Sequence, residues 1–188
     1  MGRDRPRGSG KGCFIDTSIA EAVVPWQMWT LTGMLRPGFN TDRTENYLNG
    51  GAAFYNIYRT KEGRFMTLGA TENKFWRLFC DTVGKPEWCE RQWEEAPQDG
   101  LMAEVATLIE EKTMAEWEAQ FSDIDCCFER VHNMEEMVDH PHIKARGMVK
   151  RGDSEGGDGT GTDPFYEVGF PAWIEGKSPE RREPVRYR

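Results

Sequence analysis

The sequence predicts a small α+β domain that contains a short antiparallel sheet and several helices and follows a long apolar helix. Three observations support this fold class. Two strand-like runs flank a short connection that ends in glycine, several segments with helical spacing begin at capping residues, and 188 residues suit one domain or slightly more. We expect three parts: residues 1–48 as linker, short strand and long helix, 49–149 as the small α+β domain, and 150–188 as a flexible Gly/Asp-rich loop and C-terminal tail.

The first part begins with a basic, Gly-rich stretch and a short apolar run at residues 13–15. Ser18 and Glu21 have the spacing of a capping box, which predicts a helix from about residue 17 to about residue 35. Its apolar residues lie nearly all round the helix axis, so we expect this helix to have neighbours on several sides. Pro25 is expected to kink it, because proline has no amide hydrogen to donate.

The second part begins with a predicted β-hairpin. Residues 54–60 and 64–68 are strand-like, and the connection between them is Lys61-Glu62-Gly63. Thr71 is then expected to cap a helix whose apolar face includes Phe75 and Phe79 and which ends at Gly84.

Further elements complete this part. We expect a helix whose buried face runs from Leu101 to Ile109, and a second one that opens with the capping box of Thr113 and Glu116. Residues 124–131 form a candidate third strand. A short helix capped by Asn133 and Glu136 then ends near His140-Pro141.

Composition and charge exclude several function classes. The net charge of −8 disfavours binding to nucleic-acid phosphates. The N-terminus lacks the apolar core of a signal peptide, and the most apolar stretch, residues 19–35, carries Glu21, Pro25 and Gln27, so we expect no membrane span. The five cysteines form no spaced framework, which favours a reduced, cytoplasmic setting.

Several short motifs do not meet the requirements of the sites that they resemble. Residues 8–12 lack the first glycine and the final Ser or Thr of a phosphate-binding loop, and residues 156–161 are one copy of a calcium-binding repeat that needs several. The four arginines near the C-terminus are interpreted as a solvated tail.

Histidines and cysteines also occur near one another, but without the spacing of a metal site. His132, His140, His142 and the adjacent pair Cys126-Cys127 contain no CxxC or HExxH pattern, so we expect no bound metal.

The hairpin and the helix after it carry a more specific signal. Residues 49–55 read Asn-Gly-Gly-Ala-Ala-Phe-Tyr, residues 58–66 read Tyr-Arg-Thr-Lys-Glu-Gly-Arg-Phe-Met, and residues 68–76 read Leu-Gly-Ala-Thr-Glu-Asn-Lys-Phe-Trp. Residues 112–117 and 125–131 add Lys-Thr-Met-Ala-Glu-Trp and Asp-Cys-Cys-Phe-Glu-Arg-Val. In this order, the motifs resemble the small domain of the family III CoA-transferases (CaiB/BaiF type), which include α-methylacyl-CoA racemases. Arg130 stands where the family usually has proline.

The resemblance implies that this sequence corresponds to the C-terminal part of such an enzyme. Family members begin with a doubly wound α/β domain that binds CoA and carries the catalytic aspartate, and we expect that domain to be absent here. Asp16 matches a later position and not that aspartate. Activity of the chain alone is therefore expected to be absent, and a homodimer or a separate N-terminal half is the expected partner.

Glu72 is the one residue that matches an active-site position of the family, where it is expected to have a supporting catalytic role. From the residues alone, Glu72 would be an ordinary first-turn glutamate that stabilises its helix. The sequence identifies no cofactor-binding residue. The resemblance implies no tightly bound cofactor, with a coenzyme A thioester as substrate.

The resemblance leaves the reaction open. The expected activity moves CoA between an acyl-CoA and a carboxylic acid, and the alternative is α-proton transfer on a 2-methylacyl-CoA, as in a racemase. A non-catalytic dimerisation or interaction module is the alternative from another class. A truncated reading frame with no function of its own is the remaining possibility.

Overall fold

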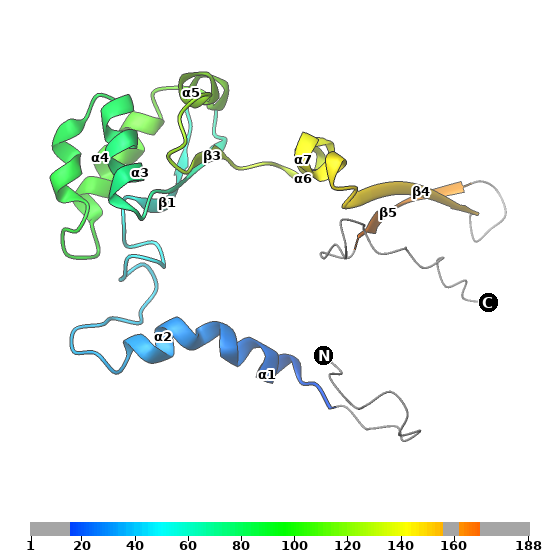
Figure 1. Ribbon diagram of the computed structural model, residues 1–188, viewed down its shortest axis with the longest axis horizontal. Helices are drawn as coiled ribbons and strands as arrows, with labels where there is room; N and C mark the ends of the chain where they lie inside the picture. The colour runs from blue at the N-terminus through cyan, green and yellow to red at the C-terminus, as the bar shows by residue number, and fades with distance from the viewer. Residues whose placement is uncertain (1–15, 156–161, 170–188) are drawn as a thin grey trace. The chain divides into compact units, whose positions relative to one another are not determined.

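The computed structural model describes residues 16–155 and 162–169 of the chain, and these form two units. The first unit ends at Arg130 and the second begins at Val131. The described residues contain seven α-helices, two 3-10 helices and two short antiparallel sheets, which confirms the small α+β domain (Figure 1). The predicted division at residues 48 and 149 stays a prediction. Among these residues, no helix has the length and apolar character needed to cross a bilayer.

The predicted long apolar helix was wrong. Residues 19–33 instead form three short segments, α1 (Ile19–Val23), the 3-10 helix η1 (Val24–Gln27) and α2 (Met28–Gly33). Pro25 lies at the start of η1, where its missing amide hydrogen interrupts the α-helical hydrogen-bond pattern. Ser18 caps α1 as expected, because its Oγ accepts a hydrogen bond from the Glu21 amide at 3.4 Å.

The three-stranded sheet of the first unit follows the predicted hairpin. Strand β1 (Tyr55–Arg59) pairs with β2 (Phe65–Gly69), and β2 pairs with β3 (Phe128–Arg130), both antiparallel. Gly63 closes the turn with φ +83°, a backbone conformation that glycine adopts without steric cost. Strand β3 is shorter than the predicted run of residues 124–131, because Cys127 has φ +59° and breaks the extended backbone.

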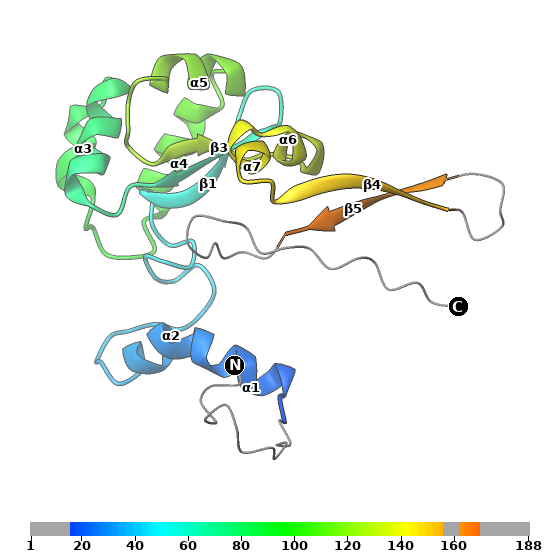
Figure 2. The same ribbon diagram turned by 45° about the vertical axis from the view of Figure 1, so that its right-hand side comes forward.

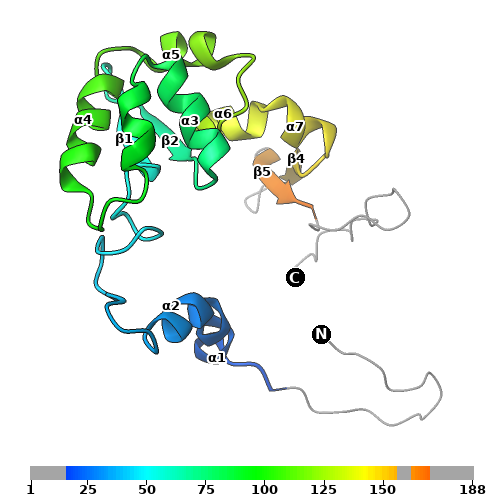
Figure 3. The same cartoon turned by 60° about the vertical axis from the view of Figure 1, so that its left-hand side comes forward.

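Helices pack on one face of this sheet. They are α3 (Asn73–Thr82), the 3-10 helix η2 (Pro86–Arg91), α4 (Asp99–Ile109) and α5 (Met114–Phe121) (Figure 3). The predicted capping box of Thr113 and Glu116 is confirmed at the start of α5. The predicted cap of α3 was wrong by one residue, since Glu72 and not Thr71 occupies the N-cap.

Aromatic rings form the centre of this core. Trp76, Phe79 and Trp117 are 0–1% exposed. Phe128 of β3 contacts Phe79 and Phe121, with ring centroids 5.3 and 4.8 Å apart. The buried indole nitrogens have partners: Trp76 Nε1 donates to the Trp88 carbonyl at 3.0 Å, and Trp117 Nε1 donates to the Ile109 carbonyl at 2.9 Å. The β2–α3 connection is anchored on this core, because Ala70 and Trp76 on either side of it are fully buried.

The second unit contains α6 (Met134–Asp139), α7 (Pro141–Ala145) and a two-stranded sheet (Figure 2). The capping box of Asn133 and Glu136 is confirmed. The expectation of a loop and tail from residue 150 was wrong where β4 (Val149–Glu155) pairs with β5 (Thr162–Val168). Strand β4 is largely polar and β5 contains Pro164, so neither sequence shows a clear strand pattern. The predicted strand at residues 13–15 and the residues from 170 onward lie outside the described residues.

Candidate functional site

The candidate site is centred on the connection between β2 and α3. The Ala70 amide donates to the Phe54 carbonyl at 2.8 Å, and the Thr71 amide donates to the Gly69 carbonyl at 3.0 Å, so the chain turns sharply as it leaves the sheet. Glu72 then adopts an extended conformation as the N-cap of α3, but its side chain accepts no hydrogen bond from the helix amides. Its carboxylate is therefore available for contacts other than capping.

Glu72 is exposed, and its nearest polar partner is Thr71. Thr71 Oγ1 donates a hydrogen bond to Glu72 Oε2 at 2.9 Å. This bond, together with one from the residue's own backbone amide, lowers the pKa of Glu72 because both favour the ionised form. The side chain is thus a carboxylate at neutral pH, available as a hydrogen-bond acceptor or an electrostatic partner.

A buried glutamine supports this turn from inside. Gln92, which is 1% exposed, donates from Nε2 to the carbonyls of Ala70 and Thr71 at 3.3 and 3.0 Å. Its Oε1 accepts a hydrogen bond from Asn73 Nδ2 at 3.0 Å. Gln92 therefore ties both sides of Glu72 to the segment after η2, which limits how far the carboxylate can move.

Cys127 lies beside the same turn. Its carbonyl accepts a hydrogen bond from the Gly69 amide at 2.8 Å, and its side chain is half-buried. Burial raises the pKa of the Cys127 thiol, and the negative charges of Asp125 and Glu72 raise it further. The thiol is therefore kept in its neutral form next to the carboxylate.

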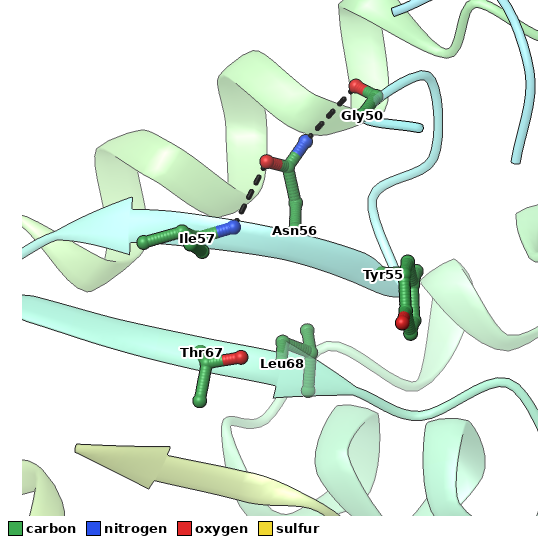
Figure 4. A pocket seen from close by; sticks show the side chains of 6 residues that line it. All are labelled: Gly50, Tyr55, Asn56, Ile57, Thr67 and Leu68. Carbon is green, nitrogen blue, oxygen red and sulfur yellow. Dashed lines mark hydrogen bonds between the residues drawn. The ribbon is translucent and has the colours of Figure 1, made fainter. Parts of the chain in front are cut away.

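A pocket of about 300 Å³ lies along the β1–β2 hairpin (Figure 4). Asn56 forms part of its wall: Nδ2 donates to the Gly50 carbonyl at 3.2 Å, and Oδ1 accepts from the Ile57 amide at 2.9 Å. The lining residues come from β1, β2 and the segment before β1, and they are Gly50, Tyr55, Asn56, Ile57, Thr67 and Leu68. This mixture offers apolar surface together with a few polar groups.

Strand pairing brings this pocket close to the turn. Tyr55 of the pocket is the direct cross-strand partner of Gly69, where the turn begins. Glu72 itself is not among the lining residues, so the pocket and the carboxylate are neighbouring features joined through Gly69. The structure thus places the predicted site residue at an exposed strand-to-helix turn that begins at Gly69, the cross-strand partner of a pocket residue.

The histidines and cysteines considered for a metal have structural contacts instead. The rings of His132 and His140 meet with centroids 5.0 Å apart, and His140 Nδ1 accepts a hydrogen bond from the His142 amide at 3.2 Å. Cys126 is fully buried. Among residues 16–155 and 162–169, no three His, Cys, Asp or Glu side chains are grouped so that they could hold a metal ion. The glycine-rich motifs at residues 8–12 and 156–161 and the arginines near the C-terminus fall outside the described residues.

The sequence interpretation did not include Tyr55, Gln92 or Cys127 in the site. The alternation of the predicted hairpin does indicate which face Tyr55 lies on. No sequence pattern around Gln92 indicates that it belongs to the site, because its partners at the turn are about 20 residues away in the sequence. Only the hydrogen bond from the Gly69 amide to the Cys127 carbonyl shows that Cys127 lies at the site, and this bond joins residues far apart in the chain.

Comparison with known proteins identifies one family. The sequence profile of CoA-transferase family III matches residues 2–185. The chain is 34% identical over 145 residues to the α-methylacyl-CoA racemase of Homo sapiens, a match covering 77% of this chain and 38% of the racemase. The racemase of Mus musculus is 32% identical over 139 residues, covering 73% of this chain and 36% of that protein. The chain thus spans well under half the length of these curated relatives.

Solved structures show the same fold. The crystal structure of Rv3272 from Mycobacterium tuberculosis (orthorhombic form) matches with a TM-score of 0.58 and 18% identity, over 86% of this chain and 41% of that one. Another crystal structure of Rv3272 matches equally, with a TM-score of 0.58 and 18% identity, over 86% of this chain and 41% of that one. At this identity, the likeness concerns the fold alone.

Proposed function

Because this chain belongs to CoA-transferase family III, we propose that it supplies the small-domain side of an acyl-CoA transferase site, which moves CoA between an acyl-CoA and a carboxylic acid. The observation that carries the proposal is the Glu72 carboxylate. It is exposed and ionised, it does not cap its own helix, and it lies three residues after Gly69, the cross-strand partner of the pocket residue Tyr55.

Glu72 would have a supporting role. A carboxylate with a lowered pKa is a weak base, so we assign it to orienting a reacting acid or base through a hydrogen bond and not to removing a proton itself. Gln92 would hold the turn so that this hydrogen bond keeps its direction. The nucleophilic aspartate and the CoA-binding half that the family uses would come from outside this sequence, either from another chain or from the remainder of a longer protein.

A racemase reaction is the second candidate. The identity of 34% to a human α-methylacyl-CoA racemase favours it. In that reaction the α-proton of a 2-methylacyl thioester would be removed and returned on the other face, and Glu72 would again orient the residues that exchange it. The two candidates differ in whether an acceptor carboxylic acid is required.

Reconstitution tests the proposal. The full 188-residue chain is combined with a nucleotide-binding domain of a family III enzyme, and CoA transfer to an added carboxylic acid is measured by mass spectrometry. The chain alone should be inactive and the combination active, with Glu72→Gln lowering turnover at least about tenfold and the exposed control Glu111→Gln leaving it unchanged. Activity of the chain alone would contradict the proposal, as would an unaffected Glu72→Gln combination.

The same preparation separates the two reactions. Incubation of a 2-methylacyl-CoA in deuterated water without an acceptor acid should give deuterium at the α-carbon only if the racemase reaction occurs. Glu72→Gln would slow that exchange in the same way. If the change has no effect on either reaction in an active combination, the small domain is a non-catalytic interaction module.

A further inference from the structure

Helix α3 and the 3-10 helix η2 bury two cysteine side chains against each other. Cys80 of α3 is 0% exposed and Cys89 of η2 is 6% exposed, and both are free thiols. The two side chains are in hydrogen-bonding contact. Neither position lies in the motifs that resemble the family, and neither thiol takes part in the proposed reaction. The fold therefore places two oxidisable groups together without an assigned use.

Backbone and side-chain bonds hold the two segments together around this pair. The Lys85 amide donates to the Cys80 carbonyl at 2.8 Å, which turns the chain from the end of α3 toward η2. Trp76, one helical turn before Cys80, donates from Nε1 to the carbonyl of Trp88 at 3.0 Å. Trp88 directly precedes Cys89 in the sequence. The contact between the thiols is thus fixed by the packing of α3 on η2.

The surroundings set the order in which the two thiols react. Burial raises the pKa of the Cys80 thiol, and the neighbouring Cys89 raises it further, so Cys80 stays a neutral thiol. Cys89 keeps the small exposed fraction through which a small oxidant such as hydrogen peroxide can reach sulfur. Cys89 is therefore the first sulfur to be oxidised, and Cys80 is the second thiol that resolves the product.

Oxidation by hydrogen peroxide proceeds in two steps. The Cys89 sulfur attacks one peroxide oxygen, the O–O bond breaks, and the departing hydroxide takes the thiol proton, which leaves a sulfenic acid and water. The Cys80 sulfur then attacks the Cys89 sulfur, the S–O bond breaks, and the hydroxyl group leaves as water with the Cys80 proton. Two thiols are oxidised to one disulfide, and one peroxide is reduced to two waters.

A disulfide at this place would act on the candidate site. The bond brings the two sulfurs to about 2.05 Å, much closer than any non-bonded contact. Cys89 lies three residues before Gln92, whose Nε2 donates to the carbonyls of Ala70 and Thr71. Cys80 lies on the helix that begins at the Glu72 turn. Because packed segments move together, drawing η2 toward α3 displaces Gln92 relative to that turn.

We propose that Cys80 and Cys89 are a redox-sensitive pair, whose oxidation by a peroxide to a disulfide shifts Gln92 and the Glu72 turn that it supports. A dithiol reductant reverses the change. Formation of the disulfide and the shift of the turn are independent of the proposed function. The expected loss of turnover rests on the proposed function, since it takes Glu72 as a site residue.

Differential alkylation tests the bond in the full 188-residue chain. Folded protein is treated with hydrogen peroxide, denatured, alkylated with iodoacetamide and digested with trypsin. One peptide, residues 78–91, carries both cysteines, because Pro86 prevents cleavage after Lys85. In the oxidised protein this peptide should lack two hydrogens and carry no alkyl group, and dithiothreitol should restore double alkylation. Cys126, which is buried elsewhere, should remain alkylated.

Variants assign the two roles. Cys80→Ala should leave the Cys89 sulfenic acid unresolved, so that dimedone labels it at least about tenfold more than in wild type. Cys89→Ala should leave Cys80 unmodified at the same peroxide dose. Cys126→Ala, a matched change of a buried cysteine, should form the disulfide to the same extent as wild type. A circular dichroism spectrum checks that each variant folds.

NMR measures the effect on the site. Oxidation of wild type should shift the amide signals of residues 69–74 and the side-chain amide of Gln92, and dithiothreitol should return them. Cys89→Ala should show neither change. In the reconstituted enzyme, oxidation should lower turnover at least about threefold in wild type and leave Cys89→Ala unchanged.

The outcomes separate this proposal from the proposed function. A peptide 78–91 that stays doubly alkylated until the protein is denatured overturns the redox pair, as does a disulfide that leaves residues 69–74 unshifted. If Glu72→Gln lowers turnover in such a case, the proposed function stands. If the disulfide forms and shifts the turn but Glu72→Gln has no effect on turnover, the redox pair stands and the proposed function is wrong.

Discussion

The hydroxyl of Thr71 donates a hydrogen bond to the carboxylate of the next residue, with Thr71 Oγ1 and Glu72 Oε2 2.9 Å apart. The bond forms because Glu72 occupies the N-cap without bonding its own helix, so that its side chain turns back toward the preceding residue. The bond keeps the carboxylate ionised and limits its orientations. This hydrogen bond thereby restricts the orientation of an exposed glutamate, as packing restricts the orientation of buried site residues.

Removing that hydroxyl should raise the pKa of Glu72. In Thr71→Val the ionised form loses its largest stabilising contact, so the titration midpoint should move up toward the ordinary value for glutamate. In the wild type, the stabilisation from this bond is present above the ordinary pKa and is lost as the pH falls through the lowered one. Carboxyl ¹³C shifts followed against pH measure both midpoints. Thr71→Ser keeps the hydroxyl and should behave as wild type, and equal midpoints in all three proteins would disprove the role of the bond.

Neutralising Glu72 should speed alkylation of Cys127. The Glu72 charge is one of the causes that raise the pKa of the Cys127 thiol, so Glu72→Gln should increase the thiolate fraction at a given pH. Iodoacetamide labelling followed by peptide mass spectrometry gives the rate. Glu111→Gln is the matched control and should not alter it. A Cys127 rate that is the same in wild type and Glu72→Gln would show that the two groups do not interact.

Replacing Gln92 by leucine should destabilise the domain. The carbonyls of Ala70 and Thr71 would lose their donor in a largely buried position, which costs about 1–3 kcal/mol of the free energy of unfolding. Urea denaturation followed by tryptophan fluorescence measures this. The exposed neighbour Glu95→Leu should stay within about 0.5 kcal/mol of wild type. A Gln92→Leu protein as stable as the control would mean that water replaces the amide.

The chain should associate with itself through the residues of α1, η1 and α2. Ile19, Trp26 and Leu35 in and next to these segments are 87%, 86% and 85% exposed, and such clustered apolar surface favours burial against another molecule. Sedimentation equilibrium should show association, and the triple change of these residues to serine should weaken it at least about tenfold. Met134→Ser, which alters an exposed side chain of α6, is the control. A monomer at high concentration would contradict the prediction.

Local patterns predicted the elements whose determinants lie close together in the sequence. The hairpin follows from alternation and from Gly63, and two capping boxes follow from residues three positions apart. Each depends on contacts within one turn or one strand pair, where spacing alone specifies the geometry. Glu72 was identified as the site residue from the family motif, and its role stays a prediction.

The remaining features depend on contacts between distant residues. The support of the turn by Gln92 joins segments about 20 residues apart, and the pairing of Gly69 with Cys127 joins strands from different parts of the chain. Strands β4 and β5 are stabilised by pairing with each other, although neither shows clear apolar alternation. The predicted long helix was wrong because one proline outweighed a favourable run of apolar residues.

The aromatic core also makes the chain its own optical probe. Trp76 and Trp117 are sealed from water, whereas Trp26, Trp29 and Trp93 are 86%, 60% and 58% exposed. A soluble quencher such as acrylamide would therefore reach the emission of these three exposed rings and leave that of the buried pair untouched. Loss of packing around Trp76 and Trp117 can then be followed as emission that becomes quenchable, without any added label.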